Sequence, residues 1–155
     1  MSAFPKEERI PTIQLVIKSL RENIYFQAIY NDDQFIGLVF VVEGKAAVYI
    51  GFLAITSNQH GHGYGSQVLQ ILRKRFIDKR IILDIEPVIK TAPNYEQRVM
   101  RLHFYERNGF SVTRRMLKDD GGRFTILTSD GNFDKSEFSQ LLNYMGFNLY
   151  KFKIE

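Results

Sequence analysis

The sequence contains no cysteine, which excludes disulfides, thiolate nucleophiles and cysteine metal sites. It also contains no apolar run that approaches the roughly 18 residues of a membrane-spanning helix, and its first residues lack the hydrophobic segment of a signal peptide. We therefore expect a protein that does not enter a membrane and that resides in the cytoplasm.

Basic residues exceed acidic residues only slightly. The chain has 21 Lys and Arg against 17 Asp and Glu, a formal net charge of +4, and its basic residues occur in short scattered clusters. Such a balance suits an anionic cofactor as well as an ordinary solvated surface. No basic motif interleaved with aromatic residues is present, so no nucleic-acid partner is expected.

The length and composition predict one globular domain spanning residues 1–155. The chain is long enough to bury a single core, and 45% of its residues are hydrophobic while 25% are charged.

The most informative stretch covers residues 49–76, where an apolar strand, a glycine-rich loop and a helix follow one another. Gly61, Gly63 and Gly65 alternate with other residues, which lets a ligand approach the backbone and permits the φ/ψ values of a tight turn. The unpaired N–H groups and the positive end of the following helix point back at this loop. The stretch therefore predicts an anion site, most simply for a pyrophosphate.

The spacing of the residues argues against two other kinds of phosphate-binding loop. A Walker loop requires a Lys before its Ser or Thr, but Ser66 follows Gly65 and the loop contains no Lys. A dinucleotide fingerprint requires a third glycine at Ser66 and a loop after the first strand of a parallel sheet, whereas two hairpin strands come first here. Asp84 does lie near the distance expected for a ribose-binding acid, so a nicotinamide-dependent oxidoreductase stays as an alternative.

The loop resembles the acetyl-CoA loop of the GCN5-related N-acetyltransferase (GNAT) family. That loop reads Arg or Gln, two residues, Gly, one residue, then Gly or Ala. The register falls on His60, Gly63 and Gly65, so both small residues fit and His60 stands where the family usually has Arg or Gln.

A second block downstream is similar to another segment of the same family. The run RLHFYERNGF looks like the helix-to-strand segment that ends in Tyr, three residues, Gly, Phe, and here those places hold Tyr105, Gly109 and Phe110. Two motifs in the right order are more specific than one glycine loop. The resemblance covers roughly residues 26–128.

The resemblance implies an α/β (α+β) fold with a mixed, mostly antiparallel sheet, a central parallel strand pair and helices on both faces. Apolar patterns agree with it. They predict strands at residues 25–30, 35–42, 49–55, 81–86, 110–117, 124–128 and 148–154. They predict helices near the N-terminus, after the glycine loop, from residue 94 or 95 until Gly109, and over residues 136–145.

The N-terminal helix is expected to bury a stripe formed by Ile13, Val16, Ile17 and Leu20, which are spaced i, i+3, i+4, i+7. Members of the resembled family usually open with a strand, but only a few residues precede this helix. One edge of the sheet is therefore expected to be open, which is compatible with a homodimer.

The resemblance implies acetyl-CoA as acetyl donor and N-acetyl transfer to a primary amine, by direct attack while both substrates are bound. The strand edge at Ala54 and Ile55 would pair with the pantetheine arm, and a backbone N–H there could polarise the thioester. The residues expected to hold the pyrophosphate are His60, Gly61, His62, Gly63, Tyr64, Gly65 and Ser66.

Two residues are candidates for proton transfer. Tyr105 is the expected general acid, because tyrosine, with a reference pKa of about 10, carries its proton at neutral pH. Core packing is the alternative for this aromatic residue near a helix end. Glu86, at the end of a strand, could accept a proton from the substrate ammonium, merely attract it, or be solvated. Asp84 is predicted to share its face, since the two residues alternate.

No metal and no covalent enzyme intermediate are expected. His60 and His62 flank Gly61, but two histidines make a weak ligand set, and no serine has a nucleophile context. His60 is expected instead to assist near phosphate. Arg98 and Arg101 lie on one helical face, where they could meet the phosphates or only solvent.

The acceptor could be a small-molecule amine or a peptide amine, chosen by the variable segments 4–23 and 87–95. Glu7 and Glu8 could attract an amine there, although surface charge explains them equally well. A non-catalytic acyl-CoA-binding regulatory module is the other alternative.

Overall fold

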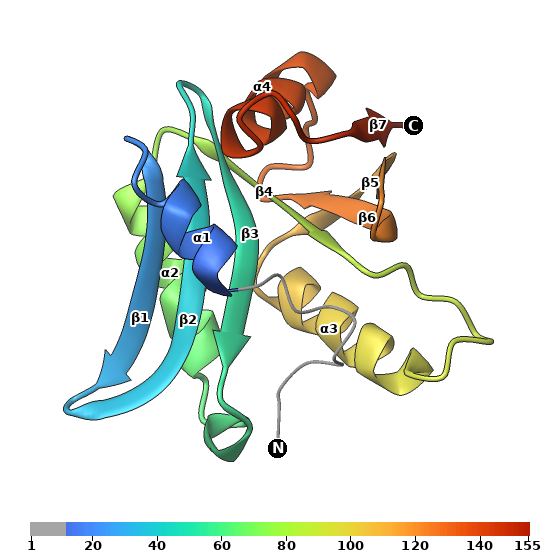
Figure 1. Cartoon of the computed structure of the whole chain (residues 1–155). Coiled ribbons are helices and arrows are strands. Elements are labelled where there is room, and N and C mark those ends of the chain that lie inside the picture. Colours follow the sequence, from blue (N-terminus) through green and yellow to red (C-terminus); the bar gives the residue numbers. More distant parts are fainter. Residues whose placement is uncertain (1–11) are drawn as a thin grey trace.

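A computed structural model describes residues 12–155, which form a seven-stranded sheet with helices on both faces (Figure 1). The helices are α1 (Thr12–Lys18), α2 (Tyr64–Arg75), α3 (Tyr95–Arg107) and α4 (Lys135–Met145), with a short 3-10 helix, η2 (Ser57–Gln59). The strands are β1 (Ile24–Asn31), β2 (Gln34–Glu43), β3 (Ala47–Ile55), β4 (Arg80–Ile85), β5 (Ser111–Asp119), β6 (Gly122–Thr128) and β7 (Phe152–Ile154). Glu7 and Glu8 lie outside the described residues.

The strand order is β1-β2-β3-β4-β6-β5-β7, and the predicted fold class is confirmed. β3 and β4 run parallel, and every other neighbouring pair is antiparallel. The glycine loop follows the third strand of an antiparallel meander. The dinucleotide-binding interpretation is therefore wrong, because it requires the loop after the first strand of a parallel sheet.

β3 and β4 separate part-way along their length. Their last pair is Ile50 with Leu83, although β3 continues to Ile55. At the same level the register with β2 shifts, because Phe40 lies opposite Phe52 and Gly51 is an extra residue in β3. A β-bulge of this kind bends the strand that carries it. The bulge thus turns β3 away from β4 and leaves the edge of β3 open on that side.

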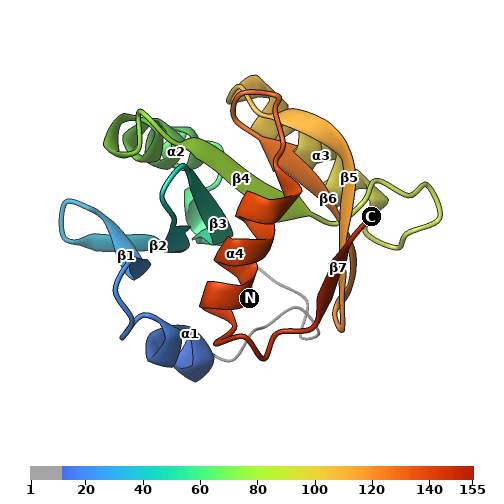
Figure 2. The ribbon, with the colours of Figure 1, turned by 90° about the horizontal axis from the view of Figure 1, so that it is seen from above.

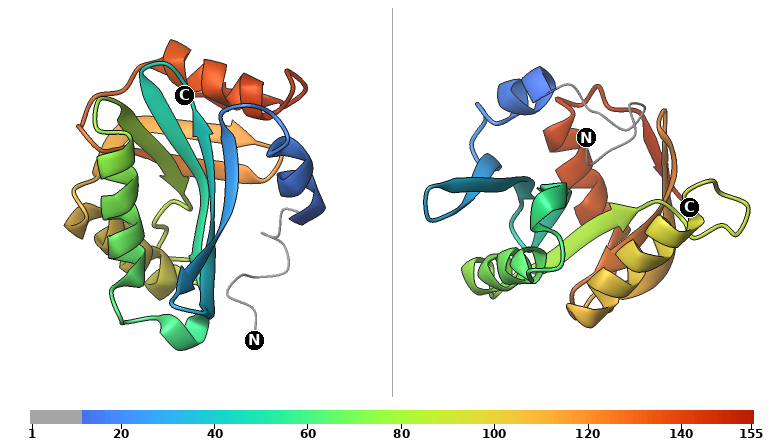
Figure 3. Two further views of the ribbon diagram at one scale, coloured as in Figure 1. Left: turned by 90° about the vertical axis from the view of Figure 1, so that its left-hand side faces the viewer. Right: turned by 90° about the horizontal axis from the view of Figure 1, so that it is seen from below.

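The sheet is covered by α2 and α3 on one face and by α1 and α4 on the other (Figures 2 and 3). Residues of β4 alternate between the two cores, so Leu83 packs with the α2 and α3 side while Ile82 packs with Phe138 of α4. No helix among residues 12–155 is long and apolar enough to cross a membrane.

α1 forms as expected, but the prediction of its buried face is wrong. Leu15 is the residue that packs into the core, at 5% exposure, while Ile13, Val16, Ile17 and Leu20 are exposed. The helix has only seven residues and ends at Lys18, before Leu20. Within residues 12–155 no strand precedes β1, which forms the outer edge of the sheet.

The predicted terminal strand is shorter than expected. Phe147 and Asn148 have positive φ values of 55° and 60°, and the Asn148 N–H donates to the Asn143 carbonyl. Because the residues that follow α4 form this left-handed turn, they are not available for a strand, and β7 begins only at Phe152.

Candidate active site

A cleft of about 550 Å³ opens where β3 separates from β4. Its walls are the end of β3, the glycine loop, the start of α2 and the second half of α3. Of the residues predicted from the sequence, the cleft is lined by Ala54, Ile55, His60, Gly61, Gly63, Tyr64, Gly65, Ser66 and Tyr105. His62 and Glu86 do not line it. The lining residues that were not predicted as site members are Leu53, Gln59, Met100, Phe104 and Arg107. The last three belong to α3, and only the packing of this helix beside the loop brings them there.

The glycine loop presents backbone N–H groups to the cleft. Gly61 and Gly63 have φ values of 80° and 78°, which glycine adopts without strain. Gly63 is the residue before α2 and offers no side-chain cap, and its carbonyl accepts the N–H of Gln67 at 3.0 Å. The N–H groups of the first three helical residues therefore stay free of a backbone acceptor within residues 12–155. This arrangement is suited to a phosphate group.

Gly65 lets α2 approach α3 closely. A Cβ atom at this position would lie 3.0 Å from Cζ of Phe104, closer than ordinary van der Waals contact. The small residue that ends the loop pattern thus favours close packing of the two helices as well as access to the backbone.

The two histidines of the loop have different surroundings. The Nε2 atom of His60 lies 2.7 Å from the Ile55 carbonyl oxygen, so the ring ties the loop to the end of β3. The ring of His62 stacks on that of Tyr64 at a centroid distance of 6.0 Å. No group of three or more potential metal ligands occurs in the part of the chain that the structure describes. The assistance of His60 to a phosphate stays a prediction.

Tyr105 lies in the last turn of α3 and is 8% exposed. Its ring packs edge-on against Phe110, and its hydroxyl makes no hydrogen bond within residues 12–155. Burial raises the pKa of Tyr105 to about 12, a shift that the Arg101 cation opposes and the Asp84 charge reinforces. The phenol therefore keeps its proton at neutral pH, as a general acid must.

The second sequence motif forms the end of α3. Gly109 has a φ of 78°, its N–H donates to the Glu106 carbonyl at 2.9 Å, and the Phe110 N–H donates to the Tyr105 carbonyl at 3.0 Å. These two bonds close the helix in a Schellman motif, which needs a left-handed residue at the Gly109 position. Arg73 of α2 donates to the Gly109 carbonyl at 2.9 Å. The motif thus fixes the backbone that carries Tyr105.

Glu86 is held by two guanidinium groups of α3. Its carboxylate lies 2.7 Å from Arg98 and 3.0 Å from Arg101, and it also accepts from the Asn94 amide. Arg98 and Arg101 share one helical face as predicted, but both bind this carboxylate, and Arg101 also lines the cleft. Glu86, the residue that follows β4, therefore connects the end of this strand with α3 through ion pairs. Its role as a proton acceptor stays a prediction.

The prediction that Asp84 and Glu86 share a face is wrong. Asp84 accepts a hydrogen bond from the Tyr49 hydroxyl at 2.5 Å, on the side of the sheet that α4 covers, whereas Glu86 binds α3. Because β4 ends at Ile85, the strand alternation does not reach Glu86.

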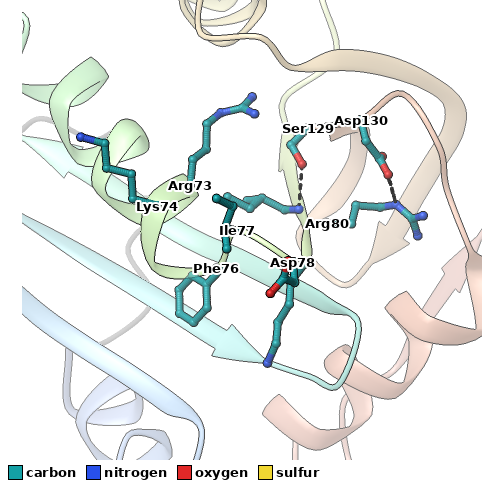
Figure 4. Close-up of a pocket in the computed structure, with 10 residues that line it drawn as sticks. Arg73, Lys74, Phe76, Ile77, Asp78, Arg80, Ser129 and Asp130 are labelled. Carbon is teal, nitrogen blue, oxygen red and sulfur yellow. Dashed lines mark hydrogen bonds and ion pairs between the residues drawn. The ribbon is translucent and has the colours of Figure 1, made fainter.

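A second pocket, of about 530 Å³, lies between the end of α2 and the start of β4 (Figure 4). It is rich in cations, but several of them are already bound within the chain. Arg80 pairs with Asp130 at 3.0 Å and Glu137 at 2.8 Å, and Lys79 pairs with Glu43 at 2.5 Å. These bridges connect the start of β4 with the end of β2, with the loop after β6 and with α4, so the pocket has a structural explanation.

The family model of the acetyltransferase (GNAT) domain matches residues 22–112, more than half of the chain. The chain belongs to the GNAT family of acetyltransferases. The family resemblance of the two sequence motifs is thereby confirmed. Both motifs, with their glycine loop and with Tyr105, fall within the matched residues.

Solved structures share the fold of this GNAT chain. A protein from Bacteroides thetaiotaomicron described as a GNAT-family acetyltransferase is 23% identical, with a TM-score of 0.71 over 95% of this chain and 84% of that one. An aminoglycoside 6'-N-acetyltransferase complexed with coenzyme A is 15% identical, with a TM-score of 0.61 over 84% and 87%. The ribosomal-protein-S18-alanine N-acetyltransferase from Escherichia coli is 12% identical, with a TM-score of 0.61 over 85% and 81%. A comparison with curated protein sequences finds no match.

Proposed function

We propose that this protein is an N-acetyltransferase that transfers the acetyl group of acetyl-CoA to a primary amine by direct attack in a ternary complex. The observation that carries the proposal is the cleft at the separation of β3 and β4, with free N–H groups at one end and Tyr105 in its wall. The GNAT family of the chain and the coenzyme A bound by the aminoglycoside acetyltransferase support the choice of donor.

Each part of the cleft suits one part of acetyl-CoA. The N–H groups of Gly61 to Ser66 would hold the pyrophosphate at the start of α2. The open edge of β3 at Ala54 and Ile55 would pair with the pantetheine arm in the manner of an added strand. The thioester would then lie near the point where β3 and β4 part, and Tyr105 would protonate the departing thiolate.

The acceptor is a primary amine of either predicted class. The structural neighbours act, by their descriptions, on an aminoglycoside and on the alanine of a ribosomal protein, so the fold accommodates small-molecule and peptide amines. A homodimer through the outer edge of β1 remains part of the proposal.

Calorimetric titration with acetyl-CoA, with NADH as the control ligand, tests the donor. Micromolar binding of acetyl-CoA alone is expected. Thiol release is then measured with a panel of spermidine, kanamycin and a peptide with an N-terminal alanine. Binding without turnover of any of these amines would favour the regulatory module, and binding of neither nucleotide would refute the proposal.

Gly63→Val is expected to weaken acetyl-CoA binding at least about tenfold. A β-branched residue is strained at a φ of 78°, and its side chain would stand before the N–H groups that face the phosphates. The dissociation constant from calorimetry measures the effect. Gly131→Val is the matched control, because Gly131 also has a positive φ of 75° and does not line the cleft. Equal losses in both variants would contradict the role of the loop.

A further inference from the structure

Arg73 connects the end of α2 with the end of α3. It lies in the last turn of α2, and its Nη2 atom donates to the carbonyl oxygens of Asn108 and Gly109, each at 2.9 Å. Asn108 is the C-cap residue of α3, and carbonyl groups at the end of a helix lack intrahelical donors. The guanidinium of Arg73 therefore supplies hydrogen bonds to the same helix end that the Schellman motif closes.

The guanidinium also packs on an aromatic ring beside Tyr105. The Cζ atom of Arg73 lies 4.8 Å from the centroid of the Phe110 ring, and a cation is attracted to the face of an aromatic ring. The Phe110 ring in turn packs edge-on against the Tyr105 ring at a centroid distance of 5.8 Å. Arg73 thus contacts two features that determine where Tyr105 lies, namely the backbone that ends α3 and the ring of Phe110.

The charge of Arg73 is directed at this helix end. Within residues 12–155 it forms no ion pair with a carboxylate, unlike the guanidinium groups of Arg80, Arg98 and Arg101. A cation at the carboxyl end of a helix interacts favourably with the helix dipole. A Cβ atom at position 109 would lie 3.0 Å from the Nη2 atom of Arg73, so the close approach depends on a glycine there.

We propose that Arg73 is a positioning residue of the reaction and holds Tyr105 in place relative to the acetyl-CoA bound at the start of α2. This inference rests on the proposed acetyltransferase function. At its start, α2 packs closely on α3, because Gly65 lies against Phe104. Arg73 makes the corresponding contact with α3 near the other end of α2. The two contacts together fix the helix that carries the general acid against the helix that would bind the donor.

A small displacement of α3 should affect proton transfer more than donor binding. A general acid needs to lie within hydrogen-bond reach of the atom that it protonates, and a misplacement of about 1 Å can cost a factor of about 100 in rate. The N–H groups that would hold the pyrophosphate belong to the glycine loop and to the first turn of α2, at the opposite end of the helix from Arg73. Loss of Arg73 should therefore lower kcat and leave the dissociation constant of acetyl-CoA nearly unchanged.

Arg73→Ala tests this role, with spermidine, kanamycin and the alanine peptide as acceptor probes. We expect kcat to fall at least about tenfold while the acetyl-CoA dissociation constant stays within about threefold of that of the parent chain. Arg75→Ala is the matched control. It removes another guanidinium from the same helix, one that lies over the rings of Tyr25 and Phe76 at 4.5 and 5.1 Å rather than at the end of α3. Its kcat should stay within about twofold of the parent value.

The double variant Arg73→Ala/Tyr105→Phe separates positioning from a general loss of structure. If Arg73 acts through the Tyr105 hydroxyl, its removal from a chain that already lacks this hydroxyl should lower kcat by less than about twofold. A merely structural role would lower kcat by the same factor in both backgrounds.

Arg73→Lys provides a second measurement if Arg73→Ala folds poorly, as followed by circular dichroism. Lysine keeps the charge but lacks the planar group that packs on a ring and donates to two carbonyls, so kcat should still fall at least about threefold. A loss below about threefold for Arg73→Ala, equal losses in both backgrounds, or a parental kcat for Arg73→Lys would overturn the role of Arg73 and leave the proposed function intact. If the parent chain binds no acetyl-CoA or acetylates no probe, both proposals fail together.

Discussion

Tyr105→Phe is expected to lower kcat at least about 100-fold and to change the acetyl-CoA dissociation constant less than about threefold. General acid catalysis contributes factors of this size, and phenylalanine keeps the ring while it removes the proton that the thiolate requires. The hydroxyl makes no hydrogen bond within residues 12–155, so the free energy of unfolding should change by less than about 1 kcal/mol. Steady-state kinetics, calorimetry and urea unfolding measure the three quantities.

Tyr30→Phe is the matched control for this substitution, because it removes the same atom from an exposed tyrosine of β1 that does not line the cleft. Its kcat should equal that of the parent chain. A Tyr105→Phe variant with full kcat would show that solvent protonates the thiolate, and Tyr105 would then be a packing residue of α3.

Phe138→Ala is expected to lower the free energy of unfolding by about 3–5 kcal/mol, the usual cost of removing a buried aromatic ring. Phe138 is 0% exposed on the buried side of α4, where its ring contacts Tyr49 and Phe133 at centroid distances of 5.2 and 5.8 Å. A loss of this size is a large fraction of the roughly 5–15 kcal/mol that stabilise an ordinary domain. Urea unfolding followed by circular dichroism measures it.

Ile71→Ala serves as the control, since Ile71 is exposed on α2 and alanine is a good helix former. Its free energy of unfolding should change by no more than about 0.5 kcal/mol. A loss below 1 kcal/mol for Phe138→Ala would mean that α4 contributes little to the core.

Local patterns were sufficient to predict most of the elements and many of the residues that line the cleft. Residues 35–42 were predicted as a strand and β2 spans Gln34–Glu43, because an unbroken apolar run between turn residues needs no distant information. The same holds for Gly63 and Gly109, whose positive φ values follow from the turns in which they stand. Gly63 and Tyr105 were assigned to the cleft from their motifs, and both line it.

Errors arose where a residue's environment depends on distant segments. The stripe of α1 that includes Ile13 and Leu20 has helical spacing, but periodicity does not say which face meets the sheet. The partners of Glu86 are arginines 12 and 15 positions further along the chain, on a helix whose docking no local pattern describes. Strand alternation likewise placed Asp84 and Glu86 together, since it did not show that β4 ends between them.

The sequence by itself determined the family, the order of the strands and helices, the glycine loop and the helix end that presents Tyr105. These features depend on contacts between near neighbours and on backbone conformations that particular residues prefer. Only the tertiary structure decided that Gly51 forms a bulge, that β3 and β4 therefore part after Ile50, and that the end of α3 lines the cleft between them. Strand register and separation arise from pairing between distant segments, and so the cleft itself could be found only in the folded chain.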